Sequence, residues 1–216
     1  MIPVTKTFFP PLEEYQKQLI PIWEKKWLTN RGETVKKMEN EIKQHLECVD
    51  FIAMNNGTIP LQIALKILGK GGEIITTPFS YVATTSAIVW ENCTPVFVDI
   101  EPNFLTIDPD KIETAITEKT TCILATHVFG NACDIEAIEK IAKRHQLHVI
   151  YDAAHCFGTK YNQTSIFDFG DVSTCSFHAT KLFHCGEGGG FFTPHSALFD
   201  QAFYMHNFGH KGHEDF

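Results

Sequence analysis

The residues most suited to catalytic chemistry lie in SFHATK at 176–181, which is followed closely by the glycine-rich GEGGG at 186–190. A lysine that leaves a strand into a glycine-rich turn can be held against a ligand, where desolvation lowers the pKa of its amine and frees it for Schiff-base chemistry. Lys181 is therefore a candidate nucleophile. The simpler interpretation is a solvated loop lysine, and for a lysine without companions it would be preferred.

A second feature is Asp152, which ends a hydrophobic run in VIYDAAH at 149–155. An aspartate in that place can pair with a protonated pyridine nitrogen and keep a cofactor ring effective as an electron sink. The alternative is a turn or helix N-cap aspartate, which is common at the ends of strands.

A third feature is NNGT at 55–58, which precedes an apolar, helix-like run. It offers backbone N–H groups, a hydroxyl and a helix N-terminus to a phosphate. Simple capping by Thr58 is the alternative. Each of the three features is a weak signal alone, and their order along the chain makes them stronger together.

Helix-like and strand-like runs that could position these residues alternate after residue 50. Helical periodicity is found at 59–68, 82–90, 108–116 and 134–145. Strand-like runs are found at 73–76, 95–100, 121–125, 147–151, 172–177 and 190–193. The alternation predicts an α/β fold, a three-layer sandwich whose mostly parallel central sheet is covered by helices on both faces. Ligands of such sheets lie at the carboxyl ends of the strands, where Asp152 and His155 are expected.

The composition sets limits on the class of protein. The 216 residues are 44% hydrophobic and 20% charged, the balance of a soluble globular chain with one large core. A formal net charge of -8 without a basic run argues against binding to nucleic acid or to an anionic membrane. There is no bilayer-length apolar run and no signal-peptide pattern, so a cytoplasmic location is expected. The 7 cysteines contain no Cys-x-x-Cys pair and are expected to be reduced and mostly buried.

Across essentially its whole length the chain resembles the fold type I sugar aminotransferases of the DegT/StrS type. The matching motifs are NGT at 56–58, TTPFSYVATTSA at 76–87, PVFVDIEP at 95–102, THVFGNACD at 126–134, YDAAH at 151–155, SFHATK at 176–181 and EGGG at 187–190. Together these motifs are highly specific. The resemblance implies that residues 1–216 form the large domain that binds pyridoxal 5'-phosphate (PLP), with a helical segment at 1–50.

Carried over position by position, the resemblance makes Lys181 the residue that forms the Schiff base with PLP and Asp152 the partner of the pyridine nitrogen. It places His155 beside the phenolic oxygen of the cofactor and Tyr81 against the face of its ring.

The same resemblance assigns the phosphate of PLP to Ser176 and to the turn formed by Gly57 and Thr58. KWLTNRGE at 26–33 and the SFHATK form of the lysine motif resemble most the dTDP-4-amino-4,6-dideoxyglucose transaminases of the family. This implies a dTDP-linked 4-keto-6-deoxy sugar as substrate, glutamate as amino donor and a homodimer. Amination at C3 of the sugar is the close alternative.

The chain departs from the family pattern after HNFGHKGHEDF at 206–216. Family members continue into a loop, whose asparagine contacts the phosphate in the neighbouring subunit, and then into a small C-terminal domain. Neither is present in these 216 residues. The resemblance therefore predicts that the chain alone is a poor catalyst.

Three other interpretations remain open. A metal site is suggested by His206, His210 and His213 with Cys185 nearby, because their spacing would place three imidazoles on one helix face. The glycines between them and the absence of HExxH argue against it. Retention of both Lys181 and Asp152 argues against a catalytically silent regulator on the same fold, and a dehydratase would be expected to have lost the lysine at position 181.

Overall fold

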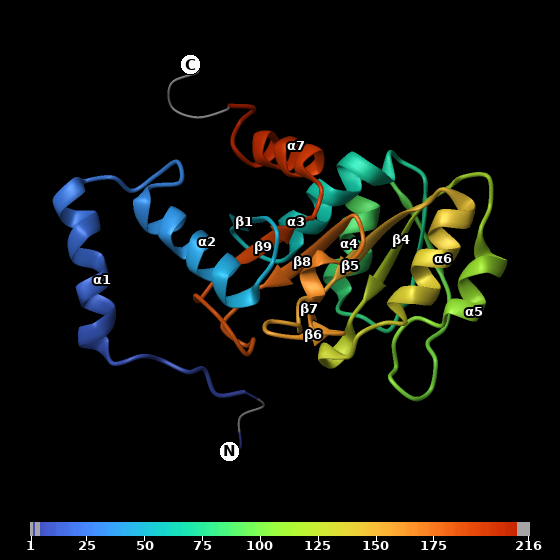
Figure 1. The fold of residues 1–216 in the computed structure, drawn as a ribbon, viewed down its shortest axis with the longest axis horizontal. Helices are drawn as coiled ribbons and strands as arrows, with labels where there is room; N and C mark the ends of the chain where they lie inside the picture. The colour runs from blue at the N-terminus through green and yellow to red at the C-terminus, as the bar shows by residue number, and fades with distance from the viewer. Residues whose placement is uncertain (1, 3–4, 211–216) are drawn as a thin grey trace.

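A seven-stranded sheet in the order β1-β9-β8-β5-β4-β2-β3 forms the centre of the computed structural model, which describes residue 2 and residues 5–210 (Figure 1). Its strands are β1 (Phe51–Met54), β2 (Glu73–Thr76), β3 (Thr94–Phe97), β4 (Thr120–Thr126), β5 (His148–Asp152), β8 (Val172–Ser176) and β9 (Gly189–Phe192). A separate ribbon pairs β6 (Lys160–Tyr161) with β7 (Thr164–Ser165).

Helices connect the strands and cover the sheet. They are α1 (Leu12–Lys25), α2 (Glu33–Leu46), α3 (Thr58–Ala64), α4 (Val82–Trp90), α5 (Pro109–Ile112), α6 (Ile135–His145) and α7 (Ser196–His206). Shorter helical turns are η1 (Leu65–Gly69), η2 (Glu113–Ala115), η3 (Val128–Gly130) and η4 (Ile166–Asp168).

The five strands β3, β2, β4, β5 and β8 pair in parallel, whereas β9 runs in the opposite direction and pairs antiparallel with β8 on one side and β1 on the other. The register pairs Asp152 with Thr126 of β4 and with Thr174 of β8. The carboxyl ends of the central strands therefore meet around Asp152. The predicted mostly parallel sheet is confirmed.

Alternate side chains of each strand enter two different cores, one on each face of the sheet. In β4, Ile123 and Ala125 pack with residues of α2, α5 and α6, whereas Cys122 and Leu124 pack with residues of α3, α4 and α7. Figure 1 shows α5 and α6 in front of the strands and α3 and α4 behind them. The predicted three-layer sandwich is confirmed.

Several element boundaries differ from the predicted ones. The predicted helix at 59–68 ends as an α-helix at Ala64 and continues as the π-helical turn η1. The predicted strand at 95–100 stops at Phe97, because Ile100 instead bridges Ile107 in a return loop. Strand β1 was not predicted, since its four residues FIAM form a short apolar run without polar–apolar alternation.

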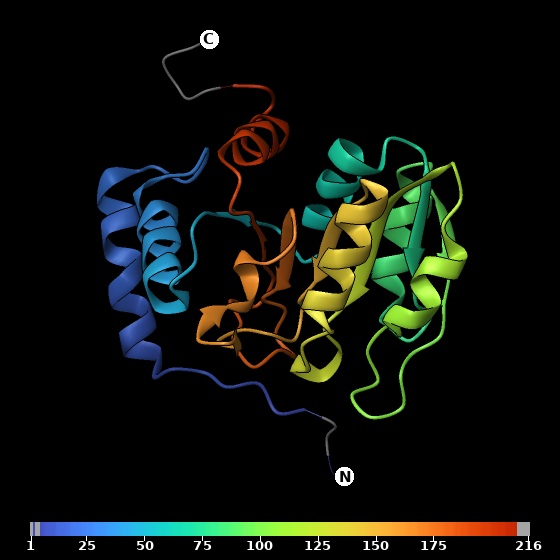
Figure 2. The same cartoon turned by 45° about the vertical axis from the view of Figure 1, so that its right-hand side comes forward.

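The two N-terminal helices are attached to the sheet very differently. Helix α1 has no buried residue, and Figure 2 shows it outside α2, away from the strands. Helix α2 is tied to β1 through the buried Glu39, whose carboxylate accepts hydrogen bonds from Arg31 Nε (2.6 Å) and from the Ala53 N–H (3.0 Å). None of the described helices combines the length and the apolar character needed to cross a membrane.

The seven cysteines are all free thiols, and six of them are buried. Burial raises the pKa of Cys48, Cys122 and Cys156 to about 12, so these thiols are held in the neutral form. The expected burial of most of the cysteines is confirmed, and Cys185 is exposed because it lies in the loop between β8 and β9.

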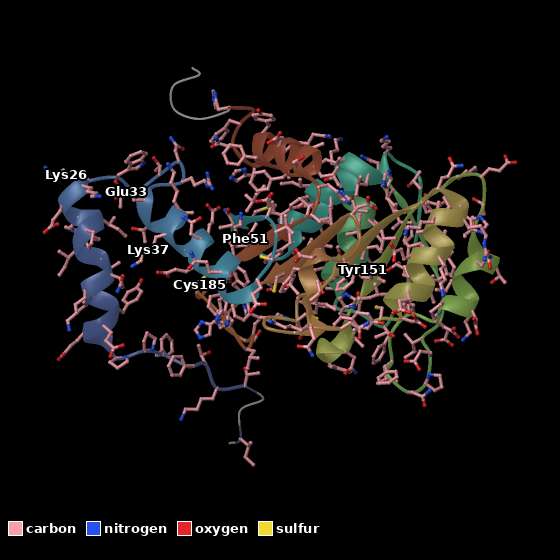
Figure 3. The ribbon with its side chains drawn as sticks, viewed as in Figure 1. Lys26, Glu33, Lys37, Phe51, Tyr151 and Cys185 are labelled. Carbon is pink, nitrogen blue, oxygen red and sulfur yellow. The ribbon has the colours of Figure 1, made fainter. Side chains whose placement is uncertain are left out.

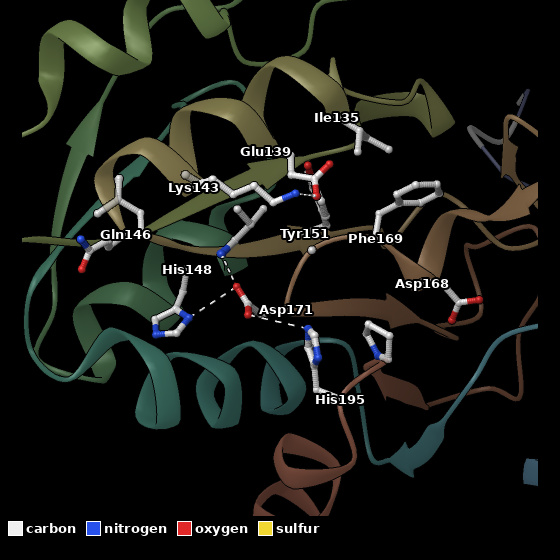
Figure 4. Close-up of a pocket in the computed structure, with 15 residues that line it drawn as sticks. Ile135, Glu139, Lys143, Gln146, His148, Tyr151, Asp168, Phe169, Asp171 and His195 are labelled. Atoms are coloured by element: carbon white, nitrogen blue, oxygen red, sulfur yellow. Dashed lines mark hydrogen bonds and ion pairs between the residues drawn. The ribbon is translucent and has the colours of Figure 1, made fainter.

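A cavity of about 610 Å³ opens at the amino ends of β5 and β8, on the opposite edge of the sheet from Asp152 (Figure 4). Asp171 is its central charged group. The Asp171 carboxylate accepts a hydrogen bond from the Val149 N–H (2.8 Å) and lies 3.4 Å from His148 Nδ1 and 3.9 Å from His195 Nε2. Asp171 thus joins the starts of β5 and β8 to the chain that leaves β9.

His127 is a fully buried titratable group at the end of β4. Its ring stacks on Tyr151 with centroids 4.4 Å apart, and Figure 3 labels Tyr151 within the body of the domain. The Nδ1 atom accepts the Cys133 N–H (3.0 Å), and Nε2 has no hydrogen-bond partner among the described residues. Burial therefore lowers the pKa of His127 to about 3.

We expect this histidine to make the fold sensitive to mild acid. The unfolded chain binds the proton near pH 6.5 and the folded chain only near pH 3, so stability is lost as pH falls through this window. Between pH 6.5 and 5.5 the wild type should lose about 1 kcal/mol of unfolding free energy more than His127→Gln does. Urea unfolding at both pH values measures the difference, and parallel losses in the two proteins would contradict it.

Candidate active site

All seven residues singled out in the sequence line one cavity of about 560 Å³. It opens at the carboxyl ends of β4, β5 and β8, as expected for an open α/β sheet. The seven are Gly57, Thr58, Tyr81, Asp152, His155, Ser176 and Lys181. Residues more than 120 positions apart in the chain are thus brought to one site.

Asp152 is a buried carboxylate at the end of β5, with 6% of its surface exposed. Its Oδ2 accepts the hydroxyl of Thr84 on α4 (2.7 Å), and its Oδ1 accepts the Ala154 N–H (3.2 Å). None of the ion pairs among the described residues includes Asp152. A buried charge of this kind needs a cationic partner, so the cavity is suited to a ligand with a positive group at that point.

Lys181 approaches the same cavity from the loop between β8 and β9. Its main-chain N–H donates to the carbonyl of His178 (2.8 Å), which folds the loop into a turn. Its amine forms no hydrogen bond or ion pair with any residue that the structure describes. A half-buried amine without a protein partner is available to react with a ligand.

His155 and Tyr81 form two walls of the cavity. His155 is reached by solvent, yet partial burial lowers the pKa of its imidazole, the charge of Lys181 lowers this pKa further and Asp152 opposes both. Tyr81 precedes α4 and is 75% exposed, which leaves its ring free to contact a ligand.

The turn at 56–58 lies directly against β8. A Cβ added to Gly57 would come 2.8 Å from Ser176 Cβ, so only glycine permits this approach. The Asn56 side chain accepts the N–H groups of Thr58 and Ile59, each at 2.9 Å. The backbone N–H groups of NNGT at 55–58 were expected to be offered to a phosphate, and that of Thr58 is instead bound by Asn56. The hydroxyls of Thr58 and Ser176 remain at the cavity wall.

Several residues of the site were not identified from the sequence. Thr84 lies behind Asp152 and donates to it, and Thr126 of the cavity lining has a buried hydroxyl for which the described residues provide no partner. His178 and Glu187 face each other at the rim, with 3.6 Å between Nε2 and Oε1. All four belong to the motifs quoted above, but nothing in the residue types alone distinguishes them from ordinary helix or loop residues.

The alternative of a histidine metal site finds no support in the described part of the chain. Helix α7 ends at His206, whose Nδ1 donates to the carbonyl of Phe203 (2.6 Å), and His210 follows a turn. His213 lies outside the described residues. Among those that are described, no three His, Cys, Asp or Glu side chains are placed to share a metal ion.

A sheet with reactive groups at the carboxyl ends of its strands defines an α/β enzyme of the open-sheet class. The chain belongs to the DegT/DnrJ/EryC1/StrS aminotransferase family, whose model matches residues 12–216.

Individual relatives agree with this assignment. The chain is 45% identical to dTDP-4-amino-4,6-dideoxy-D-glucose transaminase of Shigella dysenteriae over 208 residues. The matched segment covers 96% of this chain and 56% of the relative. It superposes with a TM-score of 0.89 and 30% identity on DesI in the presence of its TDP-sugar product, over 96% of this chain and 52% of that one.

A third similar protein is NtdA of Bacillus subtilis with bound cofactor PMP, with a TM-score of 0.83 and 31% identity, over 94% of this chain and 48% of that one. The chain thus spans about half the length of the relatives it matches.

We expect Thr84 to be required for the stable burial of Asp152. Thr84→Val keeps the shape of the side chain but leaves Oδ2 without its donor, which should lower the free energy of unfolding by about 1–3 kcal/mol at neutral pH. Thr84→Ser, which keeps the hydroxyl, and Thr85→Val, in the same helix, should cost less. Denaturant unfolding tests the series, and equal effects of Thr84→Val and Thr85→Val would refute the role.

Proposed function

We propose that this chain forms the cofactor-binding large domain of a PLP-dependent aminotransferase that acts on a nucleotide-linked keto-sugar. The observation that carries the proposal is the pairing, in one cavity, of an unpartnered amine at Lys181 with a buried, unpaired carboxylate at Asp152. An aldehyde-bearing pyridinium is complementary to both groups. The family membership and the PMP bound in a structural relative support the same cofactor.

The residues of the cavity fit PLP at each of its polar groups. Asp152 would accept a hydrogen bond from the protonated ring nitrogen, and the exposed ring of Tyr81 would cover one face. The hydroxyls of Ser176 and Thr58, with the close turn at Gly57, would hold the phosphate. His155 would lie beside the phenolic oxygen.

The chemistry then divides between cofactor and protein. PLP, when bound, supplies the electron sink that permits transfer of an amino group. Asp152 keeps the ring nitrogen protonated, because a buried carboxylate stabilises a cation beside it. Lys181 Nζ is the one amine among the described residues that line the cavity, and we assign to it the uptake and return of a proton.

The substrate is proposed to be a dTDP-linked 4-keto-6-deoxy sugar, with glutamate as the amino donor. Support comes from the relative of Shigella dysenteriae, named for a dTDP-4-amino-4,6-dideoxy sugar, and from the TDP-sugar product in the DesI structure. We further propose a cytoplasmic location, for which the free state of all seven cysteines is the supporting feature.

Lys181→Ala tests the proposed attachment of PLP. The 216-residue chain incubated with PLP and reduced with borohydride should carry the cofactor on the peptide that contains Lys181. Lys181→Ala should lose this adduct, and Lys160→Ala, which changes an exposed lysine paired with Glu47, should keep it. An unchanged adduct yield in Lys181→Ala would exclude the assignment.

Asp152→Asn tests the proposed partner of the ring nitrogen, with turnover as the measurement. The substitution keeps the shape of the side chain but removes the charge opposite the ring nitrogen, so turnover of glutamate and a dTDP-4-keto-6-deoxy sugar should fall more than about tenfold while the fold is retained. Near-normal turnover would contradict the proposed role of Asp152 as the partner of the ring nitrogen.

A homodimer is also proposed, since the molecule exposes apolar side chains that a single copy does not cover. Helix α1 presents Leu12, Tyr15, Ile20 and Trp23, all more than half exposed. Near the cavity, Tyr81 and Phe129 are 75% and 67% exposed. Apolar surface of this extent is typical of an interface between subunits.

We expect light scattering to give the mass of two copies, and Trp23→Glu on α1 to shift the chain towards one copy. Lys17→Glu, a charge change on the same helix, serves as the control for added acidic charge. A monomer at all accessible concentrations, with full transaminase activity, would contradict both the proposed dimer and the expectation that the chain alone is a poor catalyst.

A further inference from the structure

The orientation of His155 is set by the main chain of a different loop. The Phe129 N–H donates to His155 Nδ1 at 3.1 Å. A main-chain N–H can only donate, so Nδ1 must act as the acceptor. In the neutral imidazole the proton is then on Nε2, and this nitrogen alone can donate to a ligand.

The loop that delivers this N–H has an unusual backbone. Phe129 has φ 56° and ψ 15°, and Gly130 follows with φ 86°, so two successive residues are left-handed. Glycine adopts such angles freely, whereas a bulky residue rarely does. Packing does not account for Phe129, since its side chain is 67% exposed.

The same loop is fastened to the strand that bears the site. The His127 N–H donates to the carbonyl of Asp152 (3.0 Å), and the Gly130 N–H donates to the carbonyl of His127 (3.2 Å). A Cβ at Gly130 would lie 3.3 Å from the carbonyl oxygen of His155, so the two segments are in close contact. The donor at Phe129 is therefore held at a fixed position relative to His155.

The surroundings of His155 also favour the neutral ring. Partial burial lowers the pKa of His155, the charge of Lys181 from the loop after β8 lowers this pKa further, and Asp152 of β5 opposes both. The Phe129 ring lies parallel to the imidazole at 6.3 Å and brings no charge. A second proton on His155 would have to be placed on Nδ1, against the Phe129 N–H.

We propose that Phe129 is a positioning residue, which through its main-chain N–H keeps His155 as the Nε2–H tautomer, so that the cavity receives one hydrogen-bond donor at a fixed point beside Lys181 and Asp152. The complementary ligand group is an anionic oxygen on an aromatic ring. This second statement rests on the proposed function, whereas the tautomer does not depend on it.

Nitrogen-15 NMR of the 216-residue chain without added cofactor tests the tautomer directly. Long-range proton–nitrogen correlations distinguish Nε2–H from Nδ1–H, and His155→Gln identifies the His155 signals. We expect the Nε2–H form at pH 7 in the wild type and in Phe129→Gly, which keeps the N–H and suits the left-handed angles. An Nδ1–H ring in the wild type, or a changed tautomer in Phe129→Gly, would overturn the role of the main chain.

Hydrogen exchange of the Phe129 amide provides an independent measurement. The amide should exchange at least about tenfold faster in His155→Ala than in the wild type, because its acceptor is removed. His155→Asn, whose carbonyl can take the place of Nδ1, should restore part of the protection. Equal exchange in the wild type and in His155→Ala would show that the hydrogen bond does not form.

The ligand is tested separately with PLP as the probe. His155→Gln can place an amide N–H near the position of Nε2 and should keep the pH dependence of the absorption of bound PLP, whereas His155→Asn should shift it. If NMR shows the Nε2–H form while both variants titrate like the wild type, the anionic oxygen is the wrong ligand group. Absence of any PLP binding would instead count against the proposed function and leave the tautomer established.

Discussion

The burial of an unpaired carboxylate at the end of β5 is the constraint on which the rest of the site depends. The two carboxylate oxygens of Asp152 must be satisfied without a cation from the protein, and each accepts one hydrogen bond, from Thr84 of α4 and from the Ala154 N–H in the turn after β5. The main-chain carbonyl of Asp152 separately accepts the His127 N–H from the loop after β4. Desolvation makes each of these contacts costly to lose, so helix, strand and loop are held in one arrangement.

The glycine-rich stretch after Lys181 was interpreted from the sequence as a turn, but its last residues belong to strand β9. Gly189 and Gly190 are buried strand residues, and added Cβ atoms would lie 2.1 Å from the Asn56 carbonyl oxygen and from Phe51 Cε2, respectively. Because β9 can pass this close, it enters the sheet between β8 and β1. The loop that carries Lys181 is therefore anchored in the sheet at both ends, and the turn at 56–57 is pressed against its base.

Much of this arrangement could be predicted from the sequence, because periodicity and the rule that parallel strands share a carboxyl edge place Asp152, Lys181 and the turn at Gly57 together. The contacts that complete the site could not. Thr84 is indistinguishable in sequence from Thr85, although only Thr84 faces the buried carboxylate. The left-handed backbone of Phe129 has no signal in its residue type, and the side chain of Asn56 folds back over the turn to bind the N–H groups of Thr58 and Ile59.

The exposure of Cys185 gives the loop between β8 and β9 a natural attachment point for a chemical label. The six other thiols are buried within the described core and are shielded from reagents in solution, whereas Cys185 is open to solvent four positions after Lys181. Partial desolvation and the nearby Glu187 raise the pKa of its thiol, so alkylation is slow but selective at mildly alkaline pH. A fluorophore introduced there without any mutation would report directly on the surroundings of the lysine-bearing loop.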